Sequence, residues 1–299
     1  MQRSAAALVL AGLLGGCAPL QHYAADSLGN ALAASGSGFA ADDDPELIRA
    51  AAPFSLKLIE SLLAERPQHA GLLTAAASGF AQYAYAFVAQ DADEIEGRDI
   101  AAAAAQRARA RSLYVRARDY GLRALEVRHP GFQQNPRASL SQLGKHDVRA
   151  LYWTALAWAA SISLAKESMQ TVADLPLVDA LVARTGELDA DFDGLDSFLI
   201  SYQMARPGVR NAEAAARRHF ERALRLSGGQ KAAPYVALAE TVCVAAQNRR
   251  EFIAALESAL AIDPAARAEW RLENRILQRR ARWLLTQADQ LFLEPEEPK

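Results

Sequence analysis

The sequence predicts an all-α fold of helical hairpins stacked into a superhelix, and three observations support this fold class. Apolar residues recur at helical spacing in the long segments, and no segment shows a sustained alternation with a period of two. Turn signals such as Arg66-Pro67, His129-Pro130-Gly131 and Ser227-Gly228-Gly229 separate these segments. A short Ala-Leu motif also returns along the chain near the ends of helices.

The repeated motif indicates the type of helical hairpin. The segments "ERALRLSGG" (221–229) and "ESALAIDPA" (257–265) align at an offset of 36 residues, and "LRALEVRHPG" (122–131) has the same form. This is how the second helix of a tetratricopeptide repeat closes, and the period of that repeat is about 34 residues. The small alanine lets helices approach, and the Pro or Gly ends each pair. We therefore expect a TPR-like α-α superhelix.

The first residues read as a secretory signal that ends in a lipid attachment site. A short cationic start with Arg3 is followed by an apolar run of ten residues, Ala5 to Leu14, which is too short to span a bilayer. The sequence Leu14-Gly15-Gly16-Cys17 is similar to the lipobox of bacterial lipoproteins. We therefore predict a signal peptide over 1–16, removed before Cys17, and lipidation of the Cys17 sulfur. Several acyl chains then hold the mature chain at the membrane.

The membrane anchor sets the predicted location and the domain boundaries. Ala18 follows the cysteine, where an aspartate favours retention at the inner membrane in enterobacterial-type sorting, so we expect the periplasmic face of the outer membrane rather than the inner membrane. Residues 17–44 are rich in Ala, Gly, Ser and Asp, which predicts a flexible tether. One TPR-like helical domain then covers 45–299, and the acidic run that precedes Pro45 caps its first helix.

The expected helices follow the turn signals in order along the chain. They span residues 45–65, 69–91, 98–128, 146–167, 175–187, 195–205, 210–226, 232–246, 249–262 and 265–292.

Two of these helices are expected to pack on two sides. In 98–128, one apolar stripe contains Ala110, Leu113, Ala117, Tyr120, Ala124 and Val127, and a second contains Ala108, Val115 and Leu122. In 146–167, the two stripes are Leu151, Ala155, Trp158 and Ile162, and Trp153, Leu156, Ala160 and Leu164. The uncharged stretch 150–165 is shorter than a membrane span, so we interpret it as a buried helix.

Composition excludes some classes of partner and cross-link. The chain has 33 Lys and Arg against 35 Asp and Glu, which gives a net charge of −2, and removing Arg3 with the signal makes it −3. Such a balance suggests neither nucleic acid nor anionic lipid as the main partner. Cys243 lies in an apolar helix and has no protein thiol to pair with once Cys17 is lipidated. We therefore expect a fold without disulfides.

The acidic segment "LDADFDGLDSFLI" partly resembles a calcium-binding loop. Asp189, Asp191, Asp193 and Gly194 match positions 1, 3, 5 and 6 of an EF-hand, but position 12, which needs a bidentate Glu, is Ile200. We expect an acidic turn between helices instead, in which Asp193 or Asp196 caps the following helix.

No constellation of residues points to catalysis, a cofactor or a metal. The five histidines (His22, His69, His129, His146 and His219) are scattered and have no Cys, His or Glu at ligand spacing. Nucleophile-elbow, P-loop and dinucleotide motifs are absent, and "LSGGQK" lacks the P-loop spacing. We therefore predict a protein that is not an enzyme.

Arginine is the main candidate for ligand or partner recognition, because the chain has 28 arginines and five lysines. In "QRARARSLYVRARDYGLR", Arg109, Arg116 and Arg123 follow one edge of a helix, and Arg107, Arg111 and Arg118 follow the other. A row of arginines can bind carboxylates in a bidentate manner. Pairing with acidic side chains of the chain itself is the more frequent alternative for any one of them.

The chain resembles a known family. The segments "ARSLYVRARDYGLRAL" (110–125), "RRHFERALRLSGGQKAAPYVALAE" (217–240) and "LENRILQRRARWLLTQADQLF" (272–292) are similar to the T component (TatT) associated with TRAP-type, tripartite ATP-independent periplasmic transporters. The likeness covers about 45–292, and its segments follow the order of that family. One position differs, because Asp196 stands where the family has a histidine after its Leu-Asp turn.

The resemblance implies a non-enzymatic, lipid-anchored periplasmic protein that acts in TRAP-type solute uptake. Its implied partner is the solute-binding protein of the transporter, with which it would exchange an organic acid, and its implied assembly is a homo-oligomer such as a trimer. The alternative is a general TPR-like scaffold for envelope assembly. Our candidate contacts with ligand or partner are Arg109, Arg111, Arg116, Tyr114, Trp153 and Asp196, in addition to lipidation at Cys17.

Overall fold

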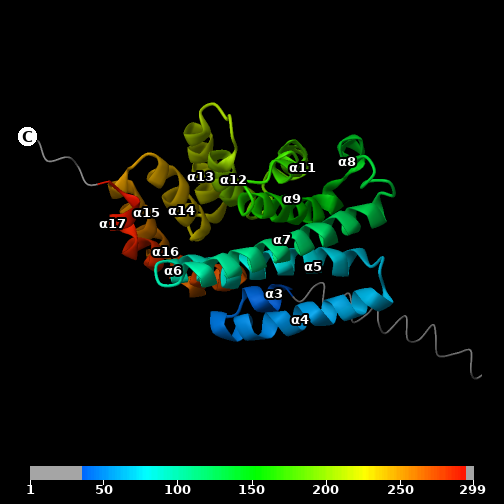
Figure 1. Ribbon diagram of the computed structural model, residues 1–299, viewed down its shortest axis with the longest axis horizontal. Coiled ribbons are helices and arrows are strands. Elements are labelled where there is room, and N and C mark those ends of the chain that lie inside the picture. Colours follow the sequence, from blue (N-terminus) through cyan, green and yellow to red (C-terminus); the bar gives the residue numbers. More distant parts are fainter. Residues whose placement is uncertain (1–35, 294–299) are drawn as a thin grey trace, which may run out of the picture.

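The computed structural model describes residues 36–293, and throughout this range the regular elements are helices joined by turns (Figure 1). This confirms the all-α prediction. The N-terminal half contains α3 (Gly36–Ala40), α4 (Pro45–Glu65), α5 (Ala70–Tyr83), η1 (Ala84–Ala89), α6 (Gln90–Glu96), α7 (Ile100–Arg128), α8 (Pro136–Ser139), η2 (Leu140–Gln142), η3 (Lys145–Asp147) and α9 (Val148–Ser163). The C-terminal half contains α10 (Met169–Val172), α11 (Leu175–Leu188), α12 (Leu195–Ala205), α13 (Ala212–Ser227), α14 (Ala233–Ala237), η4 (Leu238–Cys243), α15 (Arg249–Ala261), η5 (Pro264–Ala266), η6 (Ala268–Trp270), α16 (Arg271–Thr286) and α17 (Ala288–Leu291).

Several predicted helices agree with the structure, and the differences have local causes. Helix α4 begins at Pro45 as expected, because the side chain of Asp44 accepts hydrogen bonds from two backbone amides of its first turn. The helix expected over 69–91 continues through a π-helical turn to Glu96. The prediction of a single helix over 265–292 is wrong at the start of this range. Arg267 has an extended backbone, so two short 3₁₀ turns precede α16.

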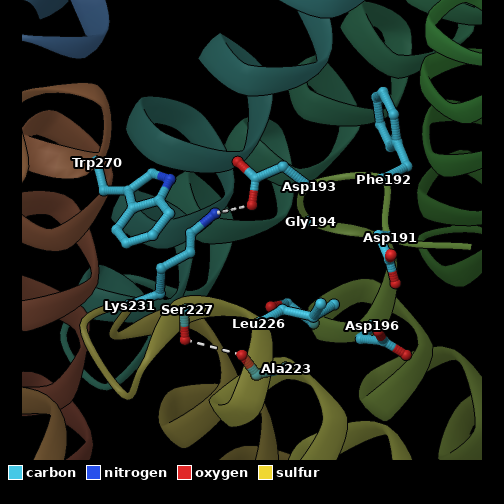
Figure 2. A pocket seen from close by; sticks show the side chains of 11 residues that line it. Asp191, Phe192, Asp193, Gly194, Asp196, Ala223, Leu226, Ser227, Lys231 and Trp270 are labelled. Carbon is cyan, nitrogen blue, oxygen red and sulfur yellow. Dashed lines mark hydrogen bonds and ion pairs between the residues drawn. The ribbon is translucent and has the colours of Figure 1, made fainter.

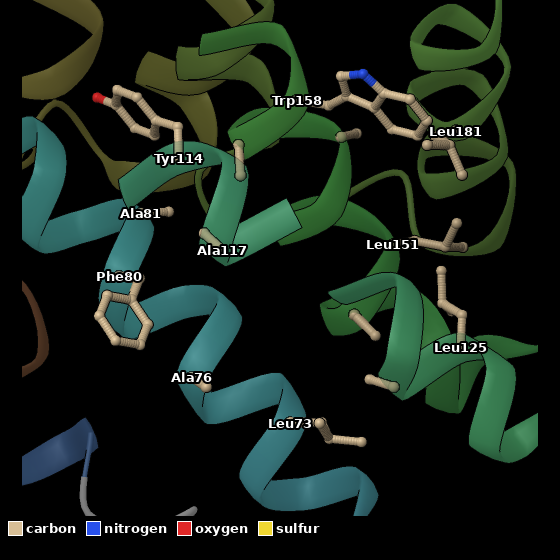
Figure 3. Packing of buried hydrophobic residues seen from close by; sticks show 14 of the residues in the cluster. Leu73, Ala76, Phe80, Ala81, Tyr114, Ala117, Leu125, Leu151, Trp158 and Leu181 are labelled. Carbon is tan, nitrogen blue, oxygen red and sulfur yellow. The ribbon is translucent and has the colours of Figure 1, made fainter. Parts of the chain in front are cut away.

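Two apolar cores divide the described chain. The first lies among α4, α5, α7, α9 and α11, where Phe80, Leu125 and Leu151 are almost fully buried (Figure 3). The second lies among α13, α14, α15 and α16, with Phe252 and Leu256 at its centre. Cys243 is buried in this second core, where desolvation raises the pKa of its thiol to about 12, so the thiol stays protonated at neutral pH.

Burial agrees with two-sided packing for α9, and for α7 it agrees everywhere except at Ala108. One predicted stripe of α9 is buried and the other is half-buried, because α5, α7, α11 and α12 pack against this helix. In α7, the face that contains Ala110 and Ala117 packs against α5 and α9, whereas Ala108 is exposed. The second α7 stripe is therefore wrong at Ala108, whereas its other members, Val115 and Leu122, are half-buried.

Within residues 36–293, one helix has the length and hydropathy of a membrane span. It is the continuous helix Ala70–Glu96, whose most apolar window has a mean hydropathy of 1.2 and is 61% buried inside the protein. Because α4, α7 and α9 pack against this helix, it serves as a core helix of the fold.

The C-terminal helix α16 returns to the N-terminal hairpin and joins the two halves (Figure 1). Arg279 binds Asp91 and Glu94 of α6 at 2.8 and 2.7 Å, and Arg271 donates a hydrogen bond to the carbonyl of Ala41. A small apolar cluster between α3, α4, η1 and α16 accompanies these bonds. The packed body therefore includes residues from Phe39 onward that the sequence assigned to the tether, while residues 1–35 lie outside the described range.

Candidate functional site

A cleft of about 300 Å³ lies between the loop before α12, the end of α13 and the turn that contains Trp270 (Figure 2). Its walls combine two aromatic side chains, other apolar side chains, three carboxylates and one lysine. They consist of Asp191, Phe192, Asp193, Gly194, Asp196, Ser197, Ala223, Leu226, Ser227, Lys231 and Trp270.

Glycines shape both sides of this cleft. Gly194 has a φ of +87°, and its carbonyl accepts a hydrogen bond from the hydroxyl of Tyr152, so the backbone turns directly into α12. A Cβ at this position would lie 2.9 Å from the Tyr152 oxygen. Gly228 and Gly229 also have positive φ and end α13, since their amides bond to the last carbonyls of that helix.

Lys231 is the buried charge of the cleft. Its side chain is only 5% exposed, and its Nζ lies 2.8 Å from Asp193 and 2.9 Å from Glu273, over the ring of Trp270. Desolvation opposes the charge, but the two carboxylates outweigh it and raise the pKa of Lys231, so the ammonium stays charged. The positive charge of Lys231 is therefore balanced by carboxylates of the protein itself.

Asp196 is buried beside the same cleft and pairs with α13. Its Oδ1 lies 2.7 Å from Nδ1 of His219, and its Oδ2 lies 3.4 Å from Arg222 without a hydrogen bond. Helix α12 therefore supplies the carboxylate of this pair, and the neighbouring helix α13 supplies the histidine.

The carboxylates of the acidic loop are directed to cations of the chain. Asp191 binds Arg222 at 2.6 Å and Asp193 binds Lys231, while Ile200 is fully buried in the second core. This arrangement engages one carboxylate oxygen at each of two positions, Asp191 and Asp193, that an EF-hand would use for calcium. It agrees with the expectation of an acidic turn, in which Gly194 rather than an aspartate is the residue before α12.

The predicted site residues do not converge on one point. Only Asp196 lines the cleft. Tyr114 is buried in the first core, where desolvation raises the pKa of its hydroxyl well above the usual value, and Trp153 is half-buried with its ring edge-on to Tyr152.

Most arginines of α7 pair with groups of the chain itself. Such pairing is the alternative to ligand binding that is more frequent for any one arginine. Arg107 binds Asp93 and Glu96, and Arg118 binds Asp119. Arg116 lies 3.6 Å from Glu60 with its guanidinium over the ring of Phe80, and Arg123 donates to the carbonyl of Pro67.

Arg109 and Arg111 differ from the other arginines of α7. Both are exposed, and within residues 36–293 neither makes a hydrogen bond, an ion pair or a ring contact. They lie on the outer face of α7, which we define as the exposed residues Ile100, Ala101, Ala104, Ala105, Ala108, Arg109, Arg111 and Ser112. This face is rich in alanine, so a partner can approach its backbone closely.

Comparison with known proteins decides the family. The family model described as TRAP transporter T-component matches residues 41–292. The chain belongs to this family. The T component is an accessory component of TRAP transport, which confirms the resemblance drawn from the sequence and associates the chain with the TRAP system.

One relative with a similar sequence covers most of the chain. It is an uncharacterized protein of Treponema pallidum (strain Nichols), which is 30% identical over 277 residues. The aligned region covers 86% of this chain and 83% of the relative. This chain and the Treponema pallidum protein are therefore similar over most of their lengths.

Proposed function

We propose that this T component is a lipid-anchored periplasmic protein that docks the solute-binding protein of a TRAP transporter through the outer face of α7. Membership in the T-component family supports a TRAP solute-binding protein as the partner. It also favours a role in TRAP transport over a role as a general scaffold for envelope assembly. The observation that carries the docking face is the pair of unpaired, exposed arginines, Arg109 and Arg111.

The outer face of α7 suits a partner of complementary charge. The alanines leave a shallow surface, and Ile100, which is 75% exposed, adds an apolar contact at its end. Guanidinium groups bind carboxylates in a fixed, often bidentate geometry. Charges at the rim of an interface accelerate association and select the partner. We therefore propose that carboxylates of the solute-binding protein meet Arg109 and Arg111.

Reversing both charges is expected to weaken docking by at least about tenfold, because each attraction becomes a repulsion. The double variant Arg109→Glu/Arg111→Glu is compared with wild type by surface plasmon resonance against a TRAP solute-binding protein of the same organism. Arg218→Glu/Arg250→Glu is the matched control, since both arginines are exposed on other helices and the charge change is the same. Equal affinity of the two double variants would refute the docking face.

The lipid anchor is part of the same proposal, and Cys17 lies outside the described residues. The lipobox and the apolar run before it support an acylated N-terminus. Cys17→Ala is expected to give a folded protein that moves from the detergent phase to the aqueous phase in a detergent-partition assay. If wild type and variant partition alike, the anchor proposal fails.

The cleft lends less support to the passing of an organic acid. Its carboxylates outnumber its cations, and Lys231 already binds Asp193 and Glu273. A ligand carboxylate would have to displace Asp193, whose side chain is 66% exposed, before it could reach the lysine. The proposal therefore rests on docking and anchoring.

A further inference from the structure

We propose that His129, His146 and Asp147 form a binding site for a zinc-class divalent metal ion at the connection between α7 and α9. This site is independent of the docking proposal. Nε2 of His129 lies 2.9 Å and Nε2 of His146 lies 3.2 Å from the same oxygen, Oδ2 of Asp147. All three ligand atoms lie within 4.8 Å of one another.

The separations suit a tetrahedral ion. With metal–ligand bonds of about 2.0–2.1 Å, neighbouring ligand atoms of a tetrahedron are about 3.3 Å apart. The two nitrogen–oxygen distances are within a few tenths of an ångström of this value, and the two imidazole nitrogens lie within 4.8 Å of each other. Modest movements of these side chains would therefore let one ion bind all three ligand atoms. Two imidazoles and one carboxylate are ligands that zinc and its neighbours in the first transition row accept.

The backbone and a neighbouring arginine orient the carboxylate. The amide of Gly144 donates to Oδ2 of Asp147 at 2.9 Å, and Arg128 lies 3.2 Å from Oδ1. Arg128 also donates to the carbonyl of His146 at 2.6 Å, which holds the short turn η3 against the end of α7. Such bonds to a ligand fix its direction before the ion arrives. The nearby guanidinium charge opposes a cation, so we expect micromolar rather than tighter affinity.

Exposure gives the ion a route in and leaves one coordination position open. Asp147 is fully buried and His129 is 15% exposed, but the side chain of His146 is 68% exposed. A second cleft of about 170 Å³ adjoins His146 and is lined in part by Arg128 and Arg149. Three protein ligands with an accessible fourth position are the arrangement in which zinc also takes a water or an external ligand.

The test is calorimetry with Zn²⁺ on the tag-free full chain in detergent, after removal of bound metal by a chelator. We expect one Zn²⁺ per chain with a micromolar Kd. His146→Ala and Asp147→Asn should each weaken binding by at least tenfold, and the asparagine retains an oxygen for the Gly144 amide. Lys145→Ala is the matched control, because Lys145 is exposed in the same turn and should leave the affinity unchanged.

Two outcomes would overturn the site. One is the absence of stoichiometric Zn²⁺ binding to the wild type. The other is binding that both ligand variants retain, which would place the ion elsewhere on the chain. A Co²⁺ spectrum of the wild-type protein provides a readout that does not depend on the stability of a variant, and an octahedral aquo-ion spectrum would also argue against the site.

Discussion

Gly121→Ala is expected to destabilise the protein by about 2 kcal/mol, although alanine is the better helix former by about 1 kcal/mol. Gly121 lies in the C-terminal third of α7, where this helix packs against α9. A Cβ there would lie 2.1 Å from Oγ1 and 3.3 Å from Cα of Thr154. Thr154 is fully buried, and its hydroxyl donates to the carbonyl of Ala150, so the two helices have to move apart. Adding a methyl group to a filled core typically costs about 1–3 kcal/mol.

Thermal and urea unfolding measure this effect, with a decrease in Tm of about 4–8 °C for a chain of this size. Gly97→Ala is the control, because Gly97 has a helical backbone and no atom lies within 4 Å of the Cβ position. The double variant Gly121→Ala/Thr154→Ala should recover part of the loss, since it removes the clashing oxygen. A Gly121→Ala protein as stable as wild type would show that the contact is not as close as described.

The sequence predicted much of the fold because it contains strong local signals for helix ends. The Asp44-Pro45 start of α4 and the Pro207-Gly208 end of α12 are examples, and both bounds agree with the structure. The surface position of Ala108 could not be predicted, because alanine fits equally well against a neighbouring helix and in solvent. Burial there depends on which helix packs alongside, and that is a property of the tertiary fold.

The candidate sites were less predictable than the helices. Lys231 follows Gly228-Gly229 and is one of five lysines among many arginines, which is a weak signal that its role differs. His129 and Asp147 are 18 residues apart, and the connection contains the short elements α8, η2 and η3, the last of which ends at Asp147. No ligand spacing in the sequence predicts that such a connection folds back on itself. Gly121 did carry a signal, since a glycine within a long helix often marks close packing.

The second large effect is expected for Arg280→Met, which should lower the free energy of unfolding by about 3 kcal/mol. The Arg280 side chain is only 12% exposed, and it binds Asp93 at 2.9 Å and also binds Glu240, with its guanidinium over the ring of Trp283. Desolvation opposes the charge, but Glu240 and Asp93 outweigh it and raise the pKa of Arg280, so the guanidinium stays charged. Removing one partner of a buried pair leaves the other charge without compensation, which costs about 3–5 kcal/mol.

The lower end of that range applies here for two reasons. The side chains of Asp93 and Glu240 are 31% and 22% exposed, so solvent screens part of the charge, and Asp93 keeps a second partner in Arg107. Methionine preserves the apolar stem over Trp283, so lost packing contributes little.

Urea unfolding compares this variant with Arg282→Met. Arg282 is an exposed arginine on the same helix, and its replacement should change stability by less than about 0.5 kcal/mol. Adding Glu240→Gln to Arg280→Met should restore part of the stability, because it removes the stranded charge. If the double variant is no more stable than Arg280→Met, the cost comes from packing rather than from the ion pair.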